Sequence, residues 1–325
     1  MSKDVVISVA MTTYNGEDYL KEQLDSILSQ SYNAFEIIIC DDGSTDSTLE
    51  ILDQYRKEYP NIYVYTNQCN LGYVKNFERV IGLCNSEYIA LSDQDDIWLK
   101  DKLQLQIEAM FETEEATKET PVLIHSDLNM IDENGLLIQR SYSDFRGYKL
   151  KVTKDLGHIL GPNGVMGNTI MINKALKEKI LPFSRYVDVH DYWIAVISEL
   201  CGVRINLSTP LVQYRIHQTN ASNDKRSLYS SKKSLQTTRK MLTRQYTLPY
   251  QNSDRKRLLE EISKRCTLNA EELSMLKAFS EYLEGINPKV MMIKNLLRYS
   301  YVKRGFWYRV KLISKILIMK RVEEV

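Results

Sequence analysis

The stretch Tyr-Ile-Ala-Leu-Ser-Asp-Gln-Asp-Asp-Ile-Trp, residues 88–98, begins as a short apolar run and stops at three carboxylates, Asp93, Asp95 and Asp96. Carboxylates this close repel one another unless a cation shares them. Because oxygen-only ligands favour a hard ion, the stretch predicts a site for Mg2+ or Mn2+. The alternative is an acidic helix N-terminus, where carboxylates accept hydrogen bonds from free N–H groups. The stretch alone does not decide between the two.

The residues before this stretch alternate between apolar runs and amphipathic segments. Strands are expected at residues 5–11, 35–40, 62–66 and 88–91, with helices at 19–30, 49–55 and 73–84. This alternation predicts an α/β fold with a doubly wound, mostly parallel sheet. Ligands collect at the carboxyl ends of such strands. The polar clusters at residues 12–15, 41–44 and 93–96 each follow a strand, so we expect one site at one sheet edge.

Charge divides the chain into two parts. Its 325 residues are 43% hydrophobic and 26% charged, enough for one large domain and an appendage. Residues 1–224 carry a net charge of −13 and residues 225–325 one of +14, which together give the +1 of the whole chain. We therefore expect a ligand-binding domain over residues 1–224 and a basic, helical region over 225–325. Residues 204–207 and 211–214 predict a closing pair of strands in the first part.

The cysteines and the N-terminus indicate an intracellular protein. Five cysteines are scattered along the chain without a C-x-x-C pair, which argues against a disulfide framework or a zinc site. They are Cys40, Cys69, Cys84, Cys201 and Cys266. The N-terminus does not have the basic start and following apolar stretch that are typical of a signal peptide. We expect reduced thiols and a cytoplasmic location.

The end of the basic region mixes large apolar side chains with cations. Residues 305–322 are interrupted by charge too often to span a bilayer, but a helix of this kind can lie at a membrane surface. The apolar residues would enter the surface, with cations near anionic headgroups. These residues are Phe306, Trp307, Val310, Ile313 and Leu317, with Lys311, Lys315 and Lys320. The alternatives are a terminal helix packed on the domain or on a partner chain, and nucleic-acid binding, which we do not expect.

Three ordered motifs carry a family resemblance. Residues 8–15 (Ser-Val-Ala-Met-Thr-Thr-Tyr-Asn), 39–46 (Ile-Cys-Asp-Asp-Gly-Ser-Thr-Asp) and 92–96 (Ser-Asp-Gln-Asp-Asp) resemble the nucleotide-diphospho-sugar glycosyltransferases of family 2, which have the GT-A fold. Their order and separations agree with that family over roughly residues 5–220. The resemblance implies an inverting transferase dependent on Mg2+ or Mn2+, and it favours the cation site over helix capping.

Position by position, the resemblance implies roles for the motif residues. Thr12, Tyr14 and Asp42 would hold the base and ribose of a nucleotide-diphospho-sugar donor. Within the Asp-Gln-Asp triplet, Asp95 would bind the metal directly and Asp93 would lie near the ribose.

Further residues around these motifs have weaker assignments. Lys75 would offset diphosphate charge, although a solvated helix face is an equal alternative. Arg215 would pair with phosphate oxygens, and His217 would complete the metal shell unless it is structural. Asp41 is expected to brace its own loop, and Asp96 to cap the helix that follows.

The base that accepts the proton of the acceptor hydroxyl falls in His190-Asp191-Tyr192-Trp193. The family places an acidic pair at the start of a helix, and Asp191 takes the aspartate position of that pair. His190 replaces the more usual acidic residue, which leaves open whether it orients Asp191, contacts the acceptor or shares the proton. Asp191 as a plain N-cap and Asp188 as a rival base are the alternatives.

Four segments together look like the bacterial rhamnosyltransferase-like branch, which builds capsular, O-antigen or cell-wall polysaccharide. They are residues 92–98, 125–127, 166–169 and 190–193. The expected donor is dTDP-L-rhamnose, with a UDP-hexose or UDP-N-acetylhexosamine left open, and the expected acceptor is a lipid-linked saccharide. The protein would then work at the inner face of the cell membrane. A non-catalytic nucleotide-sugar-binding subunit is the alternative from another class.

Overall fold

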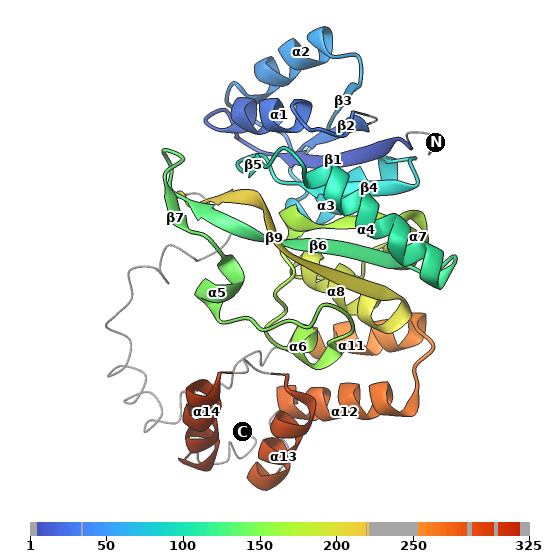
Figure 1. Ribbon diagram of the computed structural model, residues 1–325, viewed down its shortest axis with the longest axis vertical. Helices are drawn as coiled ribbons and strands as arrows, with labels where there is room; N and C mark the ends of the chain where they lie inside the picture. Colours follow the sequence, from blue (N-terminus) through green and yellow to red (C-terminus); the bar gives the residue numbers. More distant parts are fainter. Residues whose placement is uncertain are drawn as a thin grey trace.

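The alternation of strands and helices is present as the sequence predicts (Figure 1). The structure is a computed structural model that describes residues 5–33, 35–218, 220, 253–284, 288–301 and 305–318. Its first seven elements are β1 (Ile7–Thr13), α1 (Leu20–Leu28), β2 (Phe35–Asp41), α2 (Thr48–Glu58), β3 (Ile62–Thr66), α3 (Tyr73–Leu83) and β4 (Tyr88–Ser92).

The sheet has a parallel half and a mixed half, in the order β3-β2-β1-β4-β8-β6-β9-β5. The strands β1 to β4 are parallel to one another. Beyond them, β8 (Met171–Asn173) runs antiparallel to β4 and to β6 (Val122–Ile131). The expected closing pair of strands is instead one long strand, β9 (Val203–Arg215), parallel to β6. Register shifts opposite Ser126 and Asp127 let this strand continue past Pro210.

Helices cover both faces of the sheet, because the side chains of a strand alternate between them. Ile7, Val9 and Met11 of β1 share one core with α1, α2 and α4 (Lys102–Thr117). Ala10, on the opposite face, belongs to a second core with α3 and α8 (His190–Cys201). The remaining elements are β5 (Ile97–Trp98), β7 (Leu137–Gln139), α5 (Tyr142–Arg146), α6 (Leu156–Leu160), η1 (Gly167–Thr169) and α7 (Lys174–Ile180).

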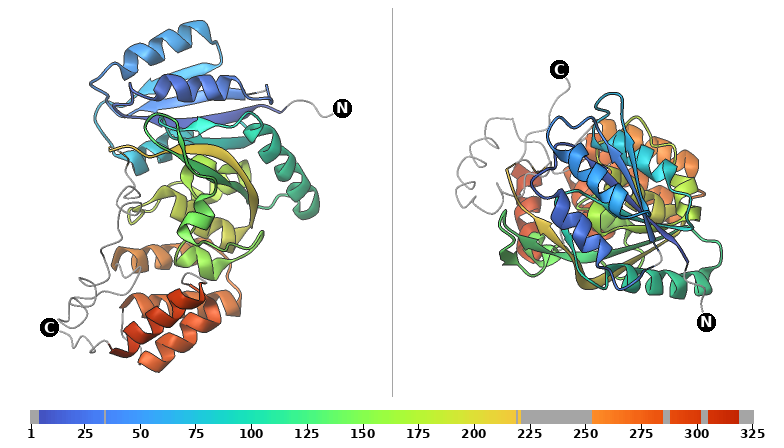
Figure 2. Two further views of the ribbon diagram at one scale, coloured as in Figure 1. Left: turned by 60° about the vertical axis from the view of Figure 1, so that its left-hand side comes forward. Right: turned by 90° about the horizontal axis from the view of Figure 1, so that it is seen from above.

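The described part of the basic region is helical, as expected. It contains α11 (Ser253–Arg265), α12 (Ala270–Glu284), α13 (Lys289–Tyr299) and α14 (Phe306–Ile318). Figure 2 shows these helices gathered at the end of the molecule opposite α1 and α2. The predicted boundary between residues 224 and 225, like Lys320, lies outside the described residues. No described helix is both long and apolar enough to cross a membrane.

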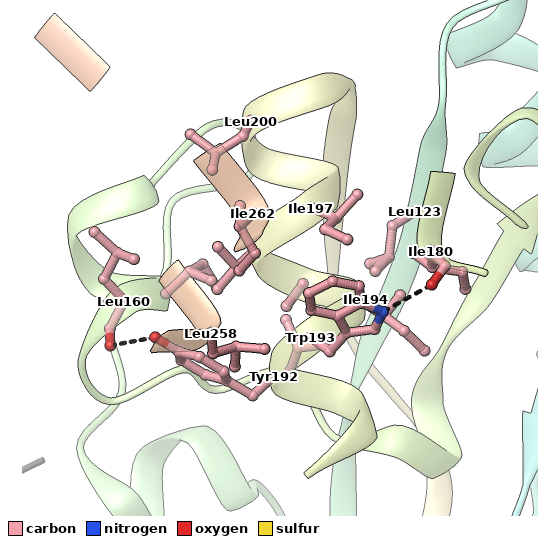
Figure 3. Close-up of a cluster of buried hydrophobic side chains, with 14 of the residues drawn as sticks. Leu123, Leu160, Ile180, Tyr192, Trp193, Ile194, Ile197, Leu200, Leu258 and Ile262 are labelled. Carbon is pink, nitrogen blue, oxygen red and sulfur yellow. Dashed lines mark hydrogen bonds between the residues drawn. The ribbon is translucent and has the colours of Figure 1, made fainter. Parts of the chain in front are cut away.

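Helix α8 is held between the sheet and α11 (Figure 3). Tyr192 and Trp193 pack in one cluster with Leu258 and Ile262 of α11. The Tyr192 hydroxyl donates to the Leu160 carbonyl at 3.0 Å, and the Trp193 indole N–H donates to a carbonyl of α7 at 2.9 Å. The C-terminal helices therefore complete the core behind the predicted base.

A disulfide joins the two parts of this core. Cys201 at the end of α8 is bonded to Cys266, just after α11. The expectation that all cysteines are reduced is therefore wrong for these two. The residues are 65 positions apart, and only the packing of α11 on α8 brings them together. Cys40, Cys69 and Cys84 are free thiols.

Candidate active site

The three polar clusters meet at one sheet edge. Because β2, β1 and β4 are parallel neighbours, the loops after Thr13, Asp41 and Ser92 emerge side by side. They open onto a cavity of about 520 Å3 that also receives the start of α8 and the segment around Gly167. Its lining includes Thr12, Tyr14, Asp42, Asp93, Asp95, His190 and Asp191. The structure thus brings together seven of the ten predicted site residues.

The loops after β1 and β4 are fastened to each other by Gln94. Its side-chain carbonyl accepts from the Tyr14 N–H at 2.7 Å, and its amide donates to the Tyr14 carbonyl at 3.0 Å. A Cβ on Gly16 would lie 2.4 Å from the same side chain, so a larger residue there would displace the Gln94 amide. Thr12 is buried in the cavity wall, while the Tyr14 ring is half exposed at its rim. Sequence reasoning assigned Gln94 no role of its own.

Asp41 braces its own loop, as expected. One carboxylate oxygen accepts from the Gly43 and Ser44 N–H groups at 3.1 and 3.0 Å. The other accepts from the hydroxyls of Thr13 at 3.0 Å and Ser44 at 2.5 Å. Both oxygens are buried in this network, so Asp41 has no side-chain role toward a ligand.

Asp42 fixes the neighbouring loop. Its carboxylate accepts from the Asn67 amide at 2.7 Å and from the Leu71 and Gly72 N–H groups at 2.8 and 2.9 Å. Gly72 has φ +79°, a left-handed conformation that glycine adopts without strain. Asp42 therefore lines the cavity with its oxygens already hydrogen-bonded, and it shapes the wall that a nucleotide would contact.

The carboxylates after β4 are in a different environment. Burial, together with the charges of Asp95 and Asp191, raises the pKa of Asp93 to about 7. The Asp95 carboxylate lies 2.9 Å from Nε2 of His217. These two side chains belong to segments that are far apart in sequence and contact each other, although His217 itself is not part of the cavity lining.

Asp96 does not cap the following helix, contrary to expectation. Helix α4 begins at Lys102, and Asp96 points inward, where it accepts from the Asn168 amide and from the Arg215 N–H at 3.1 Å. Burial, followed by the charges of Asp95 and Asp93, raises its pKa well above the usual value. Asp96 thereby ties the acidic loop to η1 and to the end of β9.

Lys102 lies behind this acidic loop. Its ammonium is fully buried 3.5 Å from the centroid of the Trp98 ring and has no hydrogen-bond partner among the described residues. Burial lowers the pKa of Lys102, and the charge of Asp96 opposes that shift. Sequence reasoning missed this residue. The lysine four positions after Trp98 could have indicated a cation–π contact.

Arg215 and Lys75 do not line the cavity. The Arg215 guanidinium donates to the Asp95 carbonyl at 3.1 Å and forms an ion pair with Glu22. Its donors hold the acidic loop in place, so the phosphate-binding role expected for Arg215 is not what the geometry provides. Lys75 pairs with Glu78 at 2.6 Å on the exposed side of α3, which matches the alternative of a solvated helix face.

The donor set of Asp95 and His217 suits a partly exposed divalent ion. Within the described ranges no group of three or more His, Cys, Asp or Glu residues is arranged to hold a metal ion by itself. One carboxylate and one imidazole leave most positions of an octahedral ion to other ligands. Diphosphate oxygens are suitable ligands for those positions, because Mg2+ is usually bound by one or two carboxylates plus substrate phosphates.

Asp191 faces the acidic loop across the cavity. It lies in the first turn of α8, where burial raises the pKa of its carboxyl to about 7. The Asn163 amide donates to it at 3.3 Å. The rival Asp188 has an exposed side chain and is not part of the cavity wall. A carboxyl group with a pKa near neutrality is suited to proton transfer at physiological pH.

His190 packs beside Asp191 as an uncharged ring. It stacks on Phe77 with ring centroids 3.9 Å apart, and burial lowers the pKa of His190 to about 3. Neither ring nitrogen has a hydrogen-bond partner among the described residues. A Cβ on Gly167 would lie 2.5 Å from Nε2. An imidazole this hard to protonate is a poor proton acceptor, so of the three open roles, sharing the proton is disfavoured.

Comparisons with known proteins agree with this geometry. Residues 8–124 match Glycosyl transferase family 2. The dTDP-rhamnosyl transferase RfbG of Shigella flexneri is 45% identical over 105 residues, which are 31% of this chain but only 36% of that protein's length. The Escherichia coli protein WfgD, a UDP-Glc:alpha-D-GlcNAc-diphosphoundecaprenol beta-1,3-glucosyltransferase, is 26% identical over 68% of this chain and 81% of its own length.

A solved structure supports the fold over almost the whole chain. Residues 1–349 of S. aureus TarS, in complex with UDP-GlcNAc, superpose with a TM-score of 0.59 and 17% sequence identity. The match covers 95% of this chain and 89% of that one. The predicted mostly parallel sheet with a helical C-terminal extension is therefore confirmed.

Proposed function

We propose that this chain is a family 2 glycosyltransferase of the GT-A fold, which moves a sugar from a nucleotide-diphospho-sugar to a saccharide acceptor in bacterial cell-surface polysaccharide synthesis. The observation that carries the proposal is the cavity in which Asp191 faces the acidic loop. A base and a site for the charged diphosphate are the two parts that such a transfer requires.

Each wall of the cavity has a task in this proposal. Thr12, Tyr14 and the loop that Asp42 holds bind the nucleotide. Asp191 removes the proton of the acceptor hydroxyl as the new glycosidic bond forms, and the bond to the diphosphate breaks. A single displacement with inversion, which the family resemblance implies, would place Asp191 and the departing diphosphate on opposite sides of the anomeric carbon.

Asp95 and His217 would hold a Mg2+ or Mn2+ ion. When bound, such an ion neutralises charge on the departing diphosphate. Asp96 and Arg215 keep the Asp95 loop in position on the protein side. The charge repulsion between Asp93 and Asp95 is what a cation at this place relieves.

The donor proposed first is dTDP-L-rhamnose, supported by the 45% identity with RfbG over 105 residues. A UDP-hexose or UDP-N-acetylhexosamine is the alternative, supported by the glucosyltransferase activity of WfgD and by the sugar nucleotide bound to TarS. Hydrolysis of a panel of dTDP-, UDP- and GDP-sugars, with and without EDTA, identifies the donor. Chelator-resistant hydrolysis would remove the metal from the proposal.

The acceptor is proposed to be a lipid-linked saccharide at the inner face of the cell membrane. A second reading, a non-catalytic subunit that only binds a nucleotide-sugar, predicts tight donor binding with no turnover. Calorimetric titration of the donor, alongside transfer to a lipid-linked saccharide, separates the two readings. Binding without hydrolysis or transfer, for every donor in the panel, would favour the subunit.

A further inference from the structure

Helices α13 and α14 are apolar on two sides. One side of each is packed into the core through Met292, Leu296, Leu312 and Ile316. The opposite side faces solvent and also carries large apolar groups, which no packing in the described residues explains. The exposed set is Val290, Met291 and Leu297 on α13, and Phe306, Trp307, Val310 and Leu317 on α14. A helix that only meets water has a polar outer face.

The exposure of the largest of these side chains is high. Phe306 is 70% exposed, Trp307 79% and Val290 77%. The two helices pack against each other, and the Lys289 ammonium donates to the Leu317 carbonyl at 2.7 Å. Figures 1 and 2 show them together at the end of the molecule away from β2 and β3. Exposed aromatic and aliphatic groups on two helices that pack together mark an interaction surface.

The polar groups on this surface are of one sign. Helix α13 contains Lys289, Lys294 and Arg298, and α14 contains Arg309, Lys311 and Lys315. Neither helix contains an aspartate or a glutamate. Lys294, Arg298 and Lys311 lie on the same exposed faces as the apolar residues. A surface that combines apolar side chains with cations only is complementary to an anionic lipid layer.

We propose that the exposed faces of α13 and α14 form a docking surface for an anionic membrane, with Phe306 and Trp307 entering the lipid and Lys294, Arg298 and Lys311 contacting its headgroups. A second copy of this chain fits less well. Self-association would bring these cations against their own copies, and like charges repel. The helices lie on the membrane surface and do not cross it, in keeping with the absence of a membrane-spanning helix among the described residues.

The docking proposal rests on the proposed function in one respect only, because a lipid-linked acceptor would require the protein to work at a membrane. Vesicle binding itself requires neither donor nor transfer. The two ideas therefore fail separately, because donor hydrolysis is measured in vesicle-free solution and docking is measured without a donor.

The test is sedimentation of the full chain with two kinds of vesicle, phosphatidylcholine alone and a mixture with about one third phosphatidylglycerol. We expect binding to the anionic vesicles and much weaker binding to the neutral ones. The double variant F306S/W307S removes the apolar contact, and the double variant K294E/K311E removes the charge contact. Each is expected to lower the fraction bound to anionic vesicles about tenfold.

Leu136 supplies a matched control, because it is 67% exposed but lies in the turn between β6 and β7. Leu136→Ser is expected to bind vesicles like the unaltered protein. All of the altered side chains are exposed, and an unchanged far-ultraviolet circular dichroism spectrum verifies that each variant is folded.

Fluorescence gives a second, independent readout. Trp98 and Trp193 are buried, so Trp307 is the one tryptophan of the sequence that is exposed to solvent. Its emission is expected to shift to shorter wavelength on anionic vesicles and to stay unchanged on neutral ones. No sedimentation with either vesicle, or variants that bind like the unaltered chain, would overturn the proposal. An oligomer that F306S/W307S dissociates in vesicle-free solution would assign the surface to a second copy instead.

Discussion

Two acidic loops stand at the same sheet edge, and their carboxylates have opposite surroundings. Asp41 and Asp42, the braced pair after β2, accept hydrogen bonds from backbone N–H groups, hydroxyls and an amide. The carboxylates of the acidic loop after β4, residues 93–96, crowd one another, and the pKa of Asp93 and of Asp96 is raised. The two loops have equivalent positions on the sheet, so the difference lies in their surroundings: burial first, and then the neighbouring carboxylates, raise the pKa of Asp93 and of Asp96.

The contrast shows that carboxylates at one edge of the sheet have two different roles. Carboxylates with donors hold loops in shape, since their charge is already compensated. Carboxylates without enough hydrogen-bond donors keep a negative charge that is not compensated by the protein, so a cation or a proton must compensate it. Asp191 in the same cavity resembles these uncompensated carboxylates, because burial also raises its pKa. The contrast can be broken or sharpened by the following substitutions.

The largest effect is expected for Asp191→Asn. The amide cannot accept the acceptor proton, so transfer should fall by about 10² to 10⁴-fold while nucleotide binding remains. Transfer is measured with a radiolabelled donor and binding by calorimetry. Asp188→Asn, on an exposed side chain nearby, is the matched control and should leave transfer unchanged. An active Asp191→Asn enzyme would move the base role to Asp188.

Next is Asp95→Asn in the acidic loop. Losing one charged ligand should weaken Mn2+ binding in the presence of UDP by about 10 to 100-fold or more, the range seen even for residues that only support metal ligands. Electron paramagnetic resonance of Mn2+ measures this directly. The control is Asp101→Asn, on an exposed residue just beyond the loop. Equal Mn2+ affinity in both variants would remove Asp95 from the metal site.

The pH dependence of the transfer rate tests the raised pKa of Asp191. The base must be deprotonated, and its pKa is raised to about 7. The transfer rate should therefore fall about tenfold for each pH unit below that value and level off above it. The profile is measured at saturating donor, with donor binding followed over the same range. A rate that is flat down to pH 5 would contradict the raised pKa.

A smaller and different effect is expected for Asp41→Asn in the braced pair. An amide nitrogen would replace one of two buried acceptors, leaving N–H or hydroxyl donors unsatisfied. The free energy of unfolding should fall by about 1–3 kcal/mol, while Mn2+ affinity of the folded protein stays the same. Urea denaturation measures the first quantity, with the exposed Asp18→Asn as control. Weakened Mn2+ binding at unchanged stability would erase the contrast between the loops.

The smallest effect is expected for Lys75→Ala, which extends the contrast to cations. Its ammonium is paired with Glu78 on an exposed helix face, and exposed pairs contribute little. The donor KM should change by less than about twofold. Steady-state hydrolysis of the preferred donor measures it. An increase of about tenfold or more would return Lys75 to the diphosphate, as the sequence first indicated.

Local pattern was enough to predict the parallel half of the sheet and the shared edge. The apolar runs that became β1, β2 and β4 end at polar clusters, and parallel neighbours must present those ends together. The start of α8 was also predictable, since the His190-Asp191 pair and the apolar residues that follow it are adjacent in sequence.

The local sequence pattern could not predict contacts between segments that are distant in the chain. Arg215 pairs with Glu22, 193 positions away, and so turns from the cavity. Asp96 meets Asn168 across 72 positions, which draws it inward from the helix it was expected to cap. The Cys201–Cys266 bond depends on how α11 packs. Each of these partners follows from tertiary packing, which neither residue spacing nor composition records.

Helix α11 has a practical consequence for protein engineering. The family match ends at residue 124, yet α8, which carries Asp191, is packed against Leu258 and Ile262 and cross-linked to Cys266. A chimera that grafts residues 8–124, or even a segment ending before α11, onto another transferase would leave Trp193 and its neighbours without their covering helix. Exchange of donor preference between relatives therefore requires α8 and α11 to be transplanted as one block.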